Sequence, residues 1–127
     1  MKTIDVRIMS AVIFYILAIA SGVWVTKLGR PLNTGVFTLH KLIALAALIL
    51  IIVIVRTLAN GIALSPAAVV CIVLTFIFFI AMFATGAVLS FEKPAPGFVL
   101  LMHKIGPALT LAASVITVFL LKGRITG

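Results

Sequence analysis

Four long apolar runs, separated by short polar stretches, dominate the sequence. The runs cover about residues 8–25, 36–55, 66–89 and 97–121, each near the roughly 20 residues that a helix needs to cross a bilayer. The connections between them are short and rich in Gly, Pro and Asn, which favour turns. Short connections make consecutive helices antiparallel. The pattern therefore predicts an all-α fold, in which residues 1–127 form a single transmembrane up-down-up-down four-helix bundle.

The first apolar run shares features with a secretory signal peptide. It follows a short basic lead and contains Ala18-Ile19-Ala20, a small-residue pattern typical of cleavage sites. The run continues past this pattern through Val25 and is long enough to span a membrane. We therefore expect an uncleaved first helix.

The composition indicates an integral membrane protein whose surroundings are a lipid bilayer. Hydrophobic residues make up 65% of the chain and the mean hydropathy is +1.44. Charged residues account for 9%, about a third of the usual share. The net charge of +8 does not indicate nucleic-acid binding, because the basic residues lie at the ends of the apolar runs, where Lys and Arg meet lipid headgroups. The sequence shows no acid/base pair or nucleophile motif that would predict a hydrolytic site.

The chain contains two histidines, and each is followed by a lysine. His40-Lys41 and His103-Lys104 lie near the starts of the second and fourth apolar runs. A histidine within a membrane span is rare, costly and by default a sign of function. Two of them in corresponding helices suggest a pair of metal ligands.

The two histidines belong to an internal repeat of two helices. A shift of 63 residues superposes the two His-Lys dipeptides, and a shift of 64 superposes Ser21-Gly22 on Thr85-Gly86. The second and fourth helices of an up-down bundle run parallel, so both histidines are expected at one depth on one side of the membrane. We predict that they are the two axial ligands of one haem iron.

The bundle geometry is compatible with this prediction. Neighbouring helix axes lie about 8–10 Å apart, which gives a diagonal of roughly 12–14 Å, enough for two imidazoles with iron–nitrogen bonds of about 2 Å. Ala44 follows His40 on its helix face and Pro107 follows His103, and these residues leave room for a flat macrocycle. Gly22 and Gly86 occupy the other two helices, where a glycine lets the backbone approach the ring closely.

The positions of His40, His103, Gly22 and Gly86 resemble the haem-binding bundle of membrane b-type cytochromes, including the cytochrome b subunit of quinol-oxidising complexes. In that family, alternate helices supply paired axial histidines and the intervening helices supply glycines that contact the macrocycle. The resemblance implies haem b, single-electron transfer, and a quinone or a redox protein as partner. The chain would then be an electron-transfer protein or an oxidoreductase subunit.

The chain departs from this family in the number of its histidines. Family members usually carry two per ligand helix, about four turns apart, for two stacked haems. The deeper positions here hold Val53 or Ile54 in the second helix, and Ile116 or Thr117 in the fourth. We therefore expect one haem b per chain, near one membrane face. Two axial histidines complete the coordination of the iron, which favours electron transfer over oxygen binding.

The lysines beside the histidines are candidate partners of the haem propionates. Lys41 and Lys104 each follow a predicted ligand, and ammonium groups bind carboxylates through charge-assisted hydrogen bonds. The basic residues divide evenly between the two sides of the membrane. If these two lysines are set aside, the positive-inside rule puts both termini in the cytoplasm and the haem near the extracytoplasmic face.

Other classes of protein remain open from the sequence. A non-redox membrane protein, such as a small transporter or a structural subunit, would hold its histidines at the headgroups. A haem carrier or insertion factor would bind haem without using it for electron transfer. A second copy of this chain is a further candidate partner. A zinc or copper transporter is disfavoured, because tetrahedral sites need more ligands than two histidines.

Overall fold

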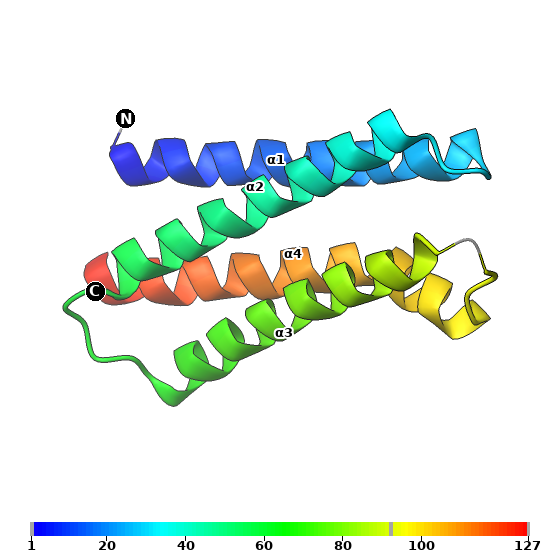
Figure 1. Cartoon of the computed structure of the whole chain (residues 1–127). Coiled ribbons are helices and arrows are strands. Elements are labelled where there is room, and N and C mark those ends of the chain that lie inside the picture. The colour runs from blue at the N-terminus through cyan, green and yellow to red at the C-terminus, as the bar shows by residue number, and fades with distance from the viewer. Residues whose placement is uncertain (1, 92, 127) are drawn as a thin grey trace. The chain divides into compact units, whose positions relative to one another are not determined.

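The computed structural model describes residues 2–91 and 93–126, and these residues form four helices without a strand. The helices are α1 (Thr3–Leu28), α2 (Thr34–Ala59), α3 (Pro66–Leu89) and α4 (Gly97–Thr126) (Figure 1). Each of them is long and apolar enough to cross a membrane. The predicted all-α transmembrane fold class is therefore confirmed, and the chain is a multi-pass integral membrane protein.

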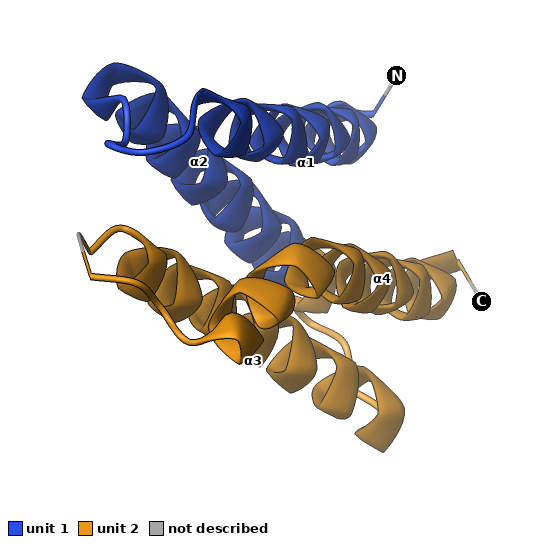
Figure 2. Cartoon of the chain, turned by 90° about the vertical axis from the view of Figure 1, so that its right-hand side faces the viewer, with its two compact units in different colours: residues 1–57 blue, residues 58–127 orange. Residues whose placement is uncertain are grey.

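The chain divides into two compact units, residues 1–57 and residues 58–127 (Figure 2). Helices α1 and α2 form an antiparallel hairpin that makes up unit 1, apart from Leu58 and Ala59 at the end of α2. Helices α3 and α4 form the corresponding hairpin of unit 2. Each candidate ligand therefore lies in a hairpin of its own, His40 in unit 1 and His103 in unit 2.

Three of the helices extend beyond the predicted apolar runs. Helix α3 has the predicted bounds, whereas α1, α2 and α4 continue through charged residues such as Arg7, Arg56 and Arg124. Lys27 was expected in the first connection and instead lies in the last turn of α1. The apolar pattern ends at the first charged residue, so it underestimates the length of these helices. The hydrogen bonds of a helix do not require apolar side chains, and the helix continues past the apolar run.

Local side-chain chemistry fixes the helix ends that define the hairpins. The Asn33 Oδ1 atom accepts a hydrogen bond from the Val36 N–H at 3.0 Å and caps α2. The Ser65 Oγ atom does the same for the Ala68 N–H of α3 at 3.2 Å. Helix α1 ends at Gly29, whose φ of +71° lies in the left-handed region that favours glycine. These ends keep the connections short.

The two hairpins bury corresponding positions, as expected of a two-helix repeat. The 63-residue shift relates four buried positions of α2 to four buried positions of α4: Ala47, Ile51, Ile54 and Leu58 to Thr110, Ser114, Thr117 and Leu121. The 64-residue shift relates buried residues of α1 to buried residues of α3: Ala11 and Tyr15 to Thr75 and Phe79. Corresponding helix faces are thus buried in the two hairpins.

The two hairpins differ in the polarity of those faces. In unit 2, the buried Thr75 and Thr117 hydroxyls meet at 3.1 Å, linking α3 to α4. Each of these hydroxyls also lies 2.8 Å from a carbonyl one turn earlier in its own helix, which satisfies it within an apolar environment. In unit 1, Arg7 Nη1 donates to Thr57 Oγ1 at 3.0 Å and links α1 to α2 at one end.

Gly106 of α4 gives a direct test of packing in unit 2. A Cβ atom at this position would overlap the thioether of Met82 from α3. We therefore expect Gly106→Ala to lower the free energy of unfolding by about 1 kcal/mol, because overpacking costs about 1–3 kcal/mol and the preference of alanine for helices offsets about 1 kcal/mol of it. Thermal unfolding in detergent measures the effect. Because Met82→Ala removes the overlapping sulfur, the double variant should recover part of the loss.

Gly123→Ala is the matched control for this prediction. Gly123 lies in the same helix, and a Cβ atom there would meet nothing within 4 Å. The control should be neutral or stabilising, because alanine favours helices more than glycine does. Equal stability of the Gly106→Ala and Gly123→Ala variants would show that Met82 does not occupy the space above Gly106.

Candidate functional site

In unit 1, the His40 imidazole of α2 lies against two consecutive residues of α1. Ser21 Oγ is 3.0 Å from His40 Nδ1. A Cβ atom on Gly22 would lie 3.1 Å from His40 Cε1, closer than ordinary van der Waals contact. The ring therefore fits against α1 because residue 22 has no side chain. Ser21 is buried and His40 is half-buried.

In unit 2, His103 of α4 has the corresponding surroundings on α3. Thr85 Oγ1 lies 2.9 Å from His103 Nδ1. A Cβ atom on Gly86 would lie 3.1 Å from His103 Cε1, the same distance as at Gly22 and His40. Both hairpins therefore hold a histidine by the same ring nitrogen and against the same kind of residue.

The hydroxyl contacts are compatible with a proton on Nδ1 of each ring. A hydroxyl has one proton to donate. Thr85 Oγ1 is 2.7 Å from the carbonyl oxygen of Ala81, one helical turn earlier, and Ser21 Oγ is 3.1 Å from the carbonyl oxygen of Ala18. With the hydroxyl protons on these carbonyls, each imidazole donates from Nδ1 to the hydroxyl oxygen. The lone pair of the ring is then on Nε2.

The structure brings together each predicted histidine with one of the predicted glycines. Gly22 touches His40 and Gly86 touches His103, so both glycines contact imidazole rings. The contact of these glycines with a macrocycle stays a prediction. Ala44 is half-buried one turn after His40.

Pro107 is half-buried one turn after His103. Proline has no N–H to bond the carbonyl of His103, so one helical hydrogen bond is missing at this turn. The helix extends on both sides of Pro107, from Gly97 to Thr126.

The lysines that follow the histidines are exposed. Lys41 Nζ lies 4.1 Å from the centroid of the Phe37 ring, one turn earlier on α2, in a cation–π contact. Lys104 lies exposed on α4. Pairing of either lysine with a haem propionate stays a prediction.

Among residues 2–91 and 93–126, no group of three or more His, Cys, Asp or Glu side chains is placed to hold a metal ion. A structural zinc site usually takes four protein ligands. A haem iron takes four nitrogens from its macrocycle and needs two axial ligands from the protein. Each hairpin supplies one imidazole, a side chain that can serve as an axial ligand of haem iron.

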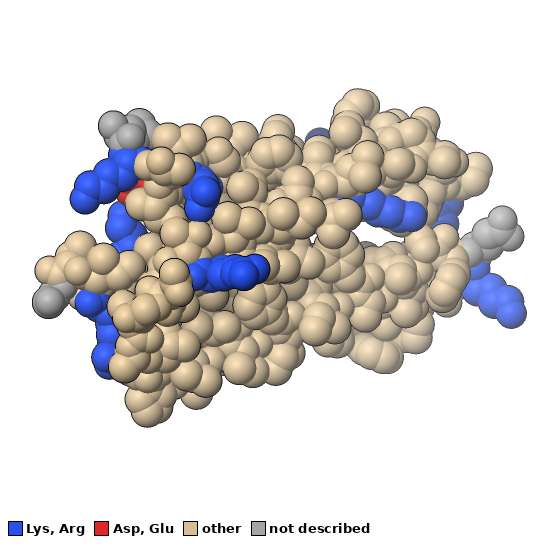
Figure 3. Space-filling model, turned by 60° about the vertical axis from the view of Figure 1, so that its left-hand side comes forward, with Lys and Arg blue, Asp and Glu red and all other residues tan. Residues whose placement is uncertain are grey.

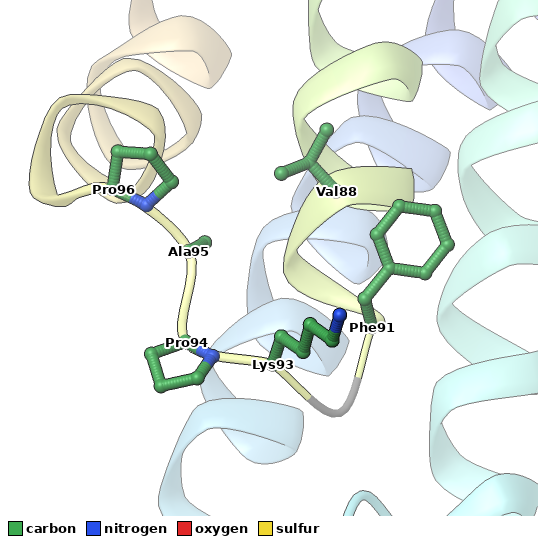
Figure 4. Close-up of a pocket in the computed structure, with 6 residues that line it drawn as sticks. All are labelled: Val88, Phe91, Lys93, Pro94, Ala95 and Pro96. Atoms are coloured by element: carbon green, nitrogen blue, oxygen red, sulfur yellow. The ribbon is translucent and has the colours of Figure 1, made fainter.

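The connection between α3 and α4 forms a pocket of about 430 Å³ (Figure 4). Of the described residues that line it, Lys93 is charged and the others are apolar: Val88, Phe91, Pro94, Ala95 and Pro96. None of the predicted ligand residues lines this pocket. The space-filling view shows Lys and Arg in separate groups on a surface made mostly of other residues (Figure 3), as expected of anchors at the ends of membrane helices.

Ser21 and Thr85 contact the histidines but were not predicted as site residues from the sequence. The 64-residue shift that aligns Gly22 with Gly86 also aligns these two hydroxyl residues. Which residue of one helix reaches a residue of the next depends on the register of the hairpin. That register follows from the helix caps and the turn, and the apolar pattern does not reveal it.

No family model, no curated protein and no solved structure matches this chain. The site is thus defined by its own geometry, as two equivalent histidine environments in two membrane hairpins.

Proposed function

We propose that this protein is a small membrane b-type cytochrome that carries one haem b with His40 and His103 as axial ligands. The observation that carries the proposal is the repeated hydrogen bond between a hydroxyl and Nδ1, with Ser21 at 3.0 Å in unit 1 and Thr85 at 2.9 Å in unit 2. Histidines that ligate metals almost always donate their second ring N–H to a hydrogen-bond acceptor, which fixes the tautomer and the ring orientation.

The chemistry of the two imidazoles supports a low-spin iron. A neutral ring that donates from Nδ1 presents its lone pair at Nε2, the atom that binds a metal. Two such ligands complete the iron coordination and leave no position for dioxygen, so the bound group would accept and release single electrons. A quinone or a redox protein is the expected exchange partner, and a second copy of the chain is another candidate.

Within each hairpin the histidine lies near the connection between its two helices, since His40 is six residues from the start of α2 and His103 is six residues from the start of α4. This placement supports electron exchange at one face. The positive-inside rule, applied without Lys41 and Lys104, orients both termini toward the cytoplasm and this face away from it.

The proposal predicts one haem b per chain. The half of each hairpin remote from its histidine has no second histidine and buries bulky side chains, among them Tyr15, Ile54 and Phe79. The pyridine haemochrome assay on the purified protein, divided by the protein concentration, should therefore give a ratio close to one. A ratio of two would contradict the proposal, because the second haem would need ligands other than histidine.

A further inference from the structure

The residue pairs Ser21-Gly22 and Thr85-Gly86 contact the two histidines in the same two ways. We propose that each pair is a seat that positions the imidazole of its own hairpin, fixing both the tautomer and the plane of the ring. Ser21 and Thr85 are then positioning residues. Their effect on an iron rests on the function proposed above, whereas their effect on the histidines does not.

The hydroxyl of each seat selects the tautomer. The 2.7 Å contact between Thr85 Oγ1 and the Ala81 carbonyl takes the hydroxyl proton, so the oxygen receives the Nδ1 proton of His103 at 2.9 Å. Ser21 has the same two kinds of contact, with the Ala18 carbonyl and with His40 Nδ1. Loss of the hydroxyl removes the oxygen that accepts the Nδ1 proton and so weakens the preference for this tautomer.

The glycine of each seat fixes the position of the ring. The Cε1 atom lies between the two ring nitrogens, and it is the atom that a Cβ on Gly22 or Gly86 would approach to 3.1 Å. A side chain at either glycine would push Cε1 away from the helix. The same movement would lengthen the bond from Nδ1 to the hydroxyl, so the two contacts of a seat act together.

The seats are more alike than the packing that surrounds them. One turn away, Met82 of α3 fills the space above Gly106 of α4. The repeat places Ala18 and Ile43 at the corresponding positions of unit 1, with the large residue on the other helix. The residues that pack next to the histidines therefore differ between the two hairpins. The hydroxyl and glycine contacts are the same in both, which indicates that their role is to position the histidine.

The first test observes the tautomers in the full chain purified without haem, by NMR of 15N-labelled histidine. Both histidines should be protonated on Nδ1. Ser21→Ala should shift the proton population of His40 toward Nε2 and leave that of His103 unchanged. Thr85→Ala should shift the proton population of His103 toward Nε2 and leave that of His40 unchanged. Ser21→Thr and Thr85→Ser keep the hydroxyl and should keep the wild-type tautomer, which separates the loss of the seat from misfolding.

Ser10→Ala is the matched control. The Ser10 hydroxyl of α1 donates at 2.9 Å to the Val6 carbonyl, one turn earlier. Its loss therefore removes the same kind of bond within the helix without touching either histidine. If wild-type His40 is protonated on Nε2, or if Ser21→Ala leaves the tautomer as Ser10→Ala does, the proposed seat is wrong.

The second test uses the haem-loaded protein and measures its midpoint potential. Donation from Nδ1 makes Nε2 a stronger electron donor and stabilises the oxidised iron. Ser21→Ala and Thr85→Ala should each raise the potential, whereas Ser21→Thr, Thr85→Ser and Ser10→Ala should not. A protein that binds no haem but shows Nδ1 protonation at both histidines would retain the seats and refute the cytochrome. Unchanged potentials in both alanine variants would refute the seats in the loaded protein.

Discussion

Replacing either histidine by alanine is expected to remove most of the bound haem. His40→Ala and His103→Ala each delete one axial ligand, and alanine offers no atom that could bind the iron. Loss of a residue that hydrogen-bonds to a metal ligand typically lowers metal affinity by about 10–100-fold. Loss of the ligand itself should lower the affinity for haem at least as much. The measurement is the ratio of haem to protein after purification, together with the absorption spectrum.

The residual haem of these variants should be five-coordinate, because one axial position has lost its protein ligand. Leu101→Ala is a suitable control, since Leu101 is exposed and lies two residues before His103 on the same helix. It should keep a low-spin spectrum. A wild-type spectrum and a full haem content in the His40→Ala variant would show that His40 is not a ligand, and the same holds for His103→Ala.

Leucine in place of Gly86 is expected to have the next largest effect. Even a Cβ atom there would lie 3.1 Å from Cε1 of His103, so the larger side chain must displace the imidazole that is proposed to bind the iron. Ala87→Leu is the matched control, because Ala87 is the next residue of α3 and is exposed. The haem content should fall strongly in Gly86→Leu and stay near wild type in Ala87→Leu.

The same comparison applies in unit 1. Gly22→Leu should lower the haem content more than Val23→Leu, since Val23 is exposed and Gly22 contacts His40. Equal haem content within each pair of variants would show that neither the rings nor a macrocycle needs the space beside these glycines.

The helices were predictable because the physics that selects them is local in sequence. A bilayer requires about 20 apolar residues per span, and turn residues such as Pro66 and Gly29 mark where a helix begins or ends. The outer ends of α1, α2 and α4 were not predictable from hydropathy. Charged residues such as Arg56 and Arg124 leave the apolar layer without leaving the helix.

The site was predictable in part. The repeat identified His40, His103 and the two glycines as equivalent positions. It did not reveal that each glycine would contact the histidine of its own hairpin, because that contact depends on the register between neighbouring helices. The role of Ser21 and Thr85 as hydrogen-bond partners depends on the same register. The contact of Met82 with Gly106 depends on side-chain volumes in three dimensions.

The most direct test of the proposed function is the absorption spectrum of the purified wild-type protein, recorded oxidised, reduced, and reduced in the presence of carbon monoxide. A haem with two imidazole ligands should give a red preparation with a Soret band and a low-spin reduced spectrum. Carbon monoxide should leave that spectrum unchanged, because both axial positions are occupied. A colourless protein, or a high-spin haem that binds carbon monoxide, would contradict the assignment of His40 and His103 as the axial ligands of a b-type cytochrome.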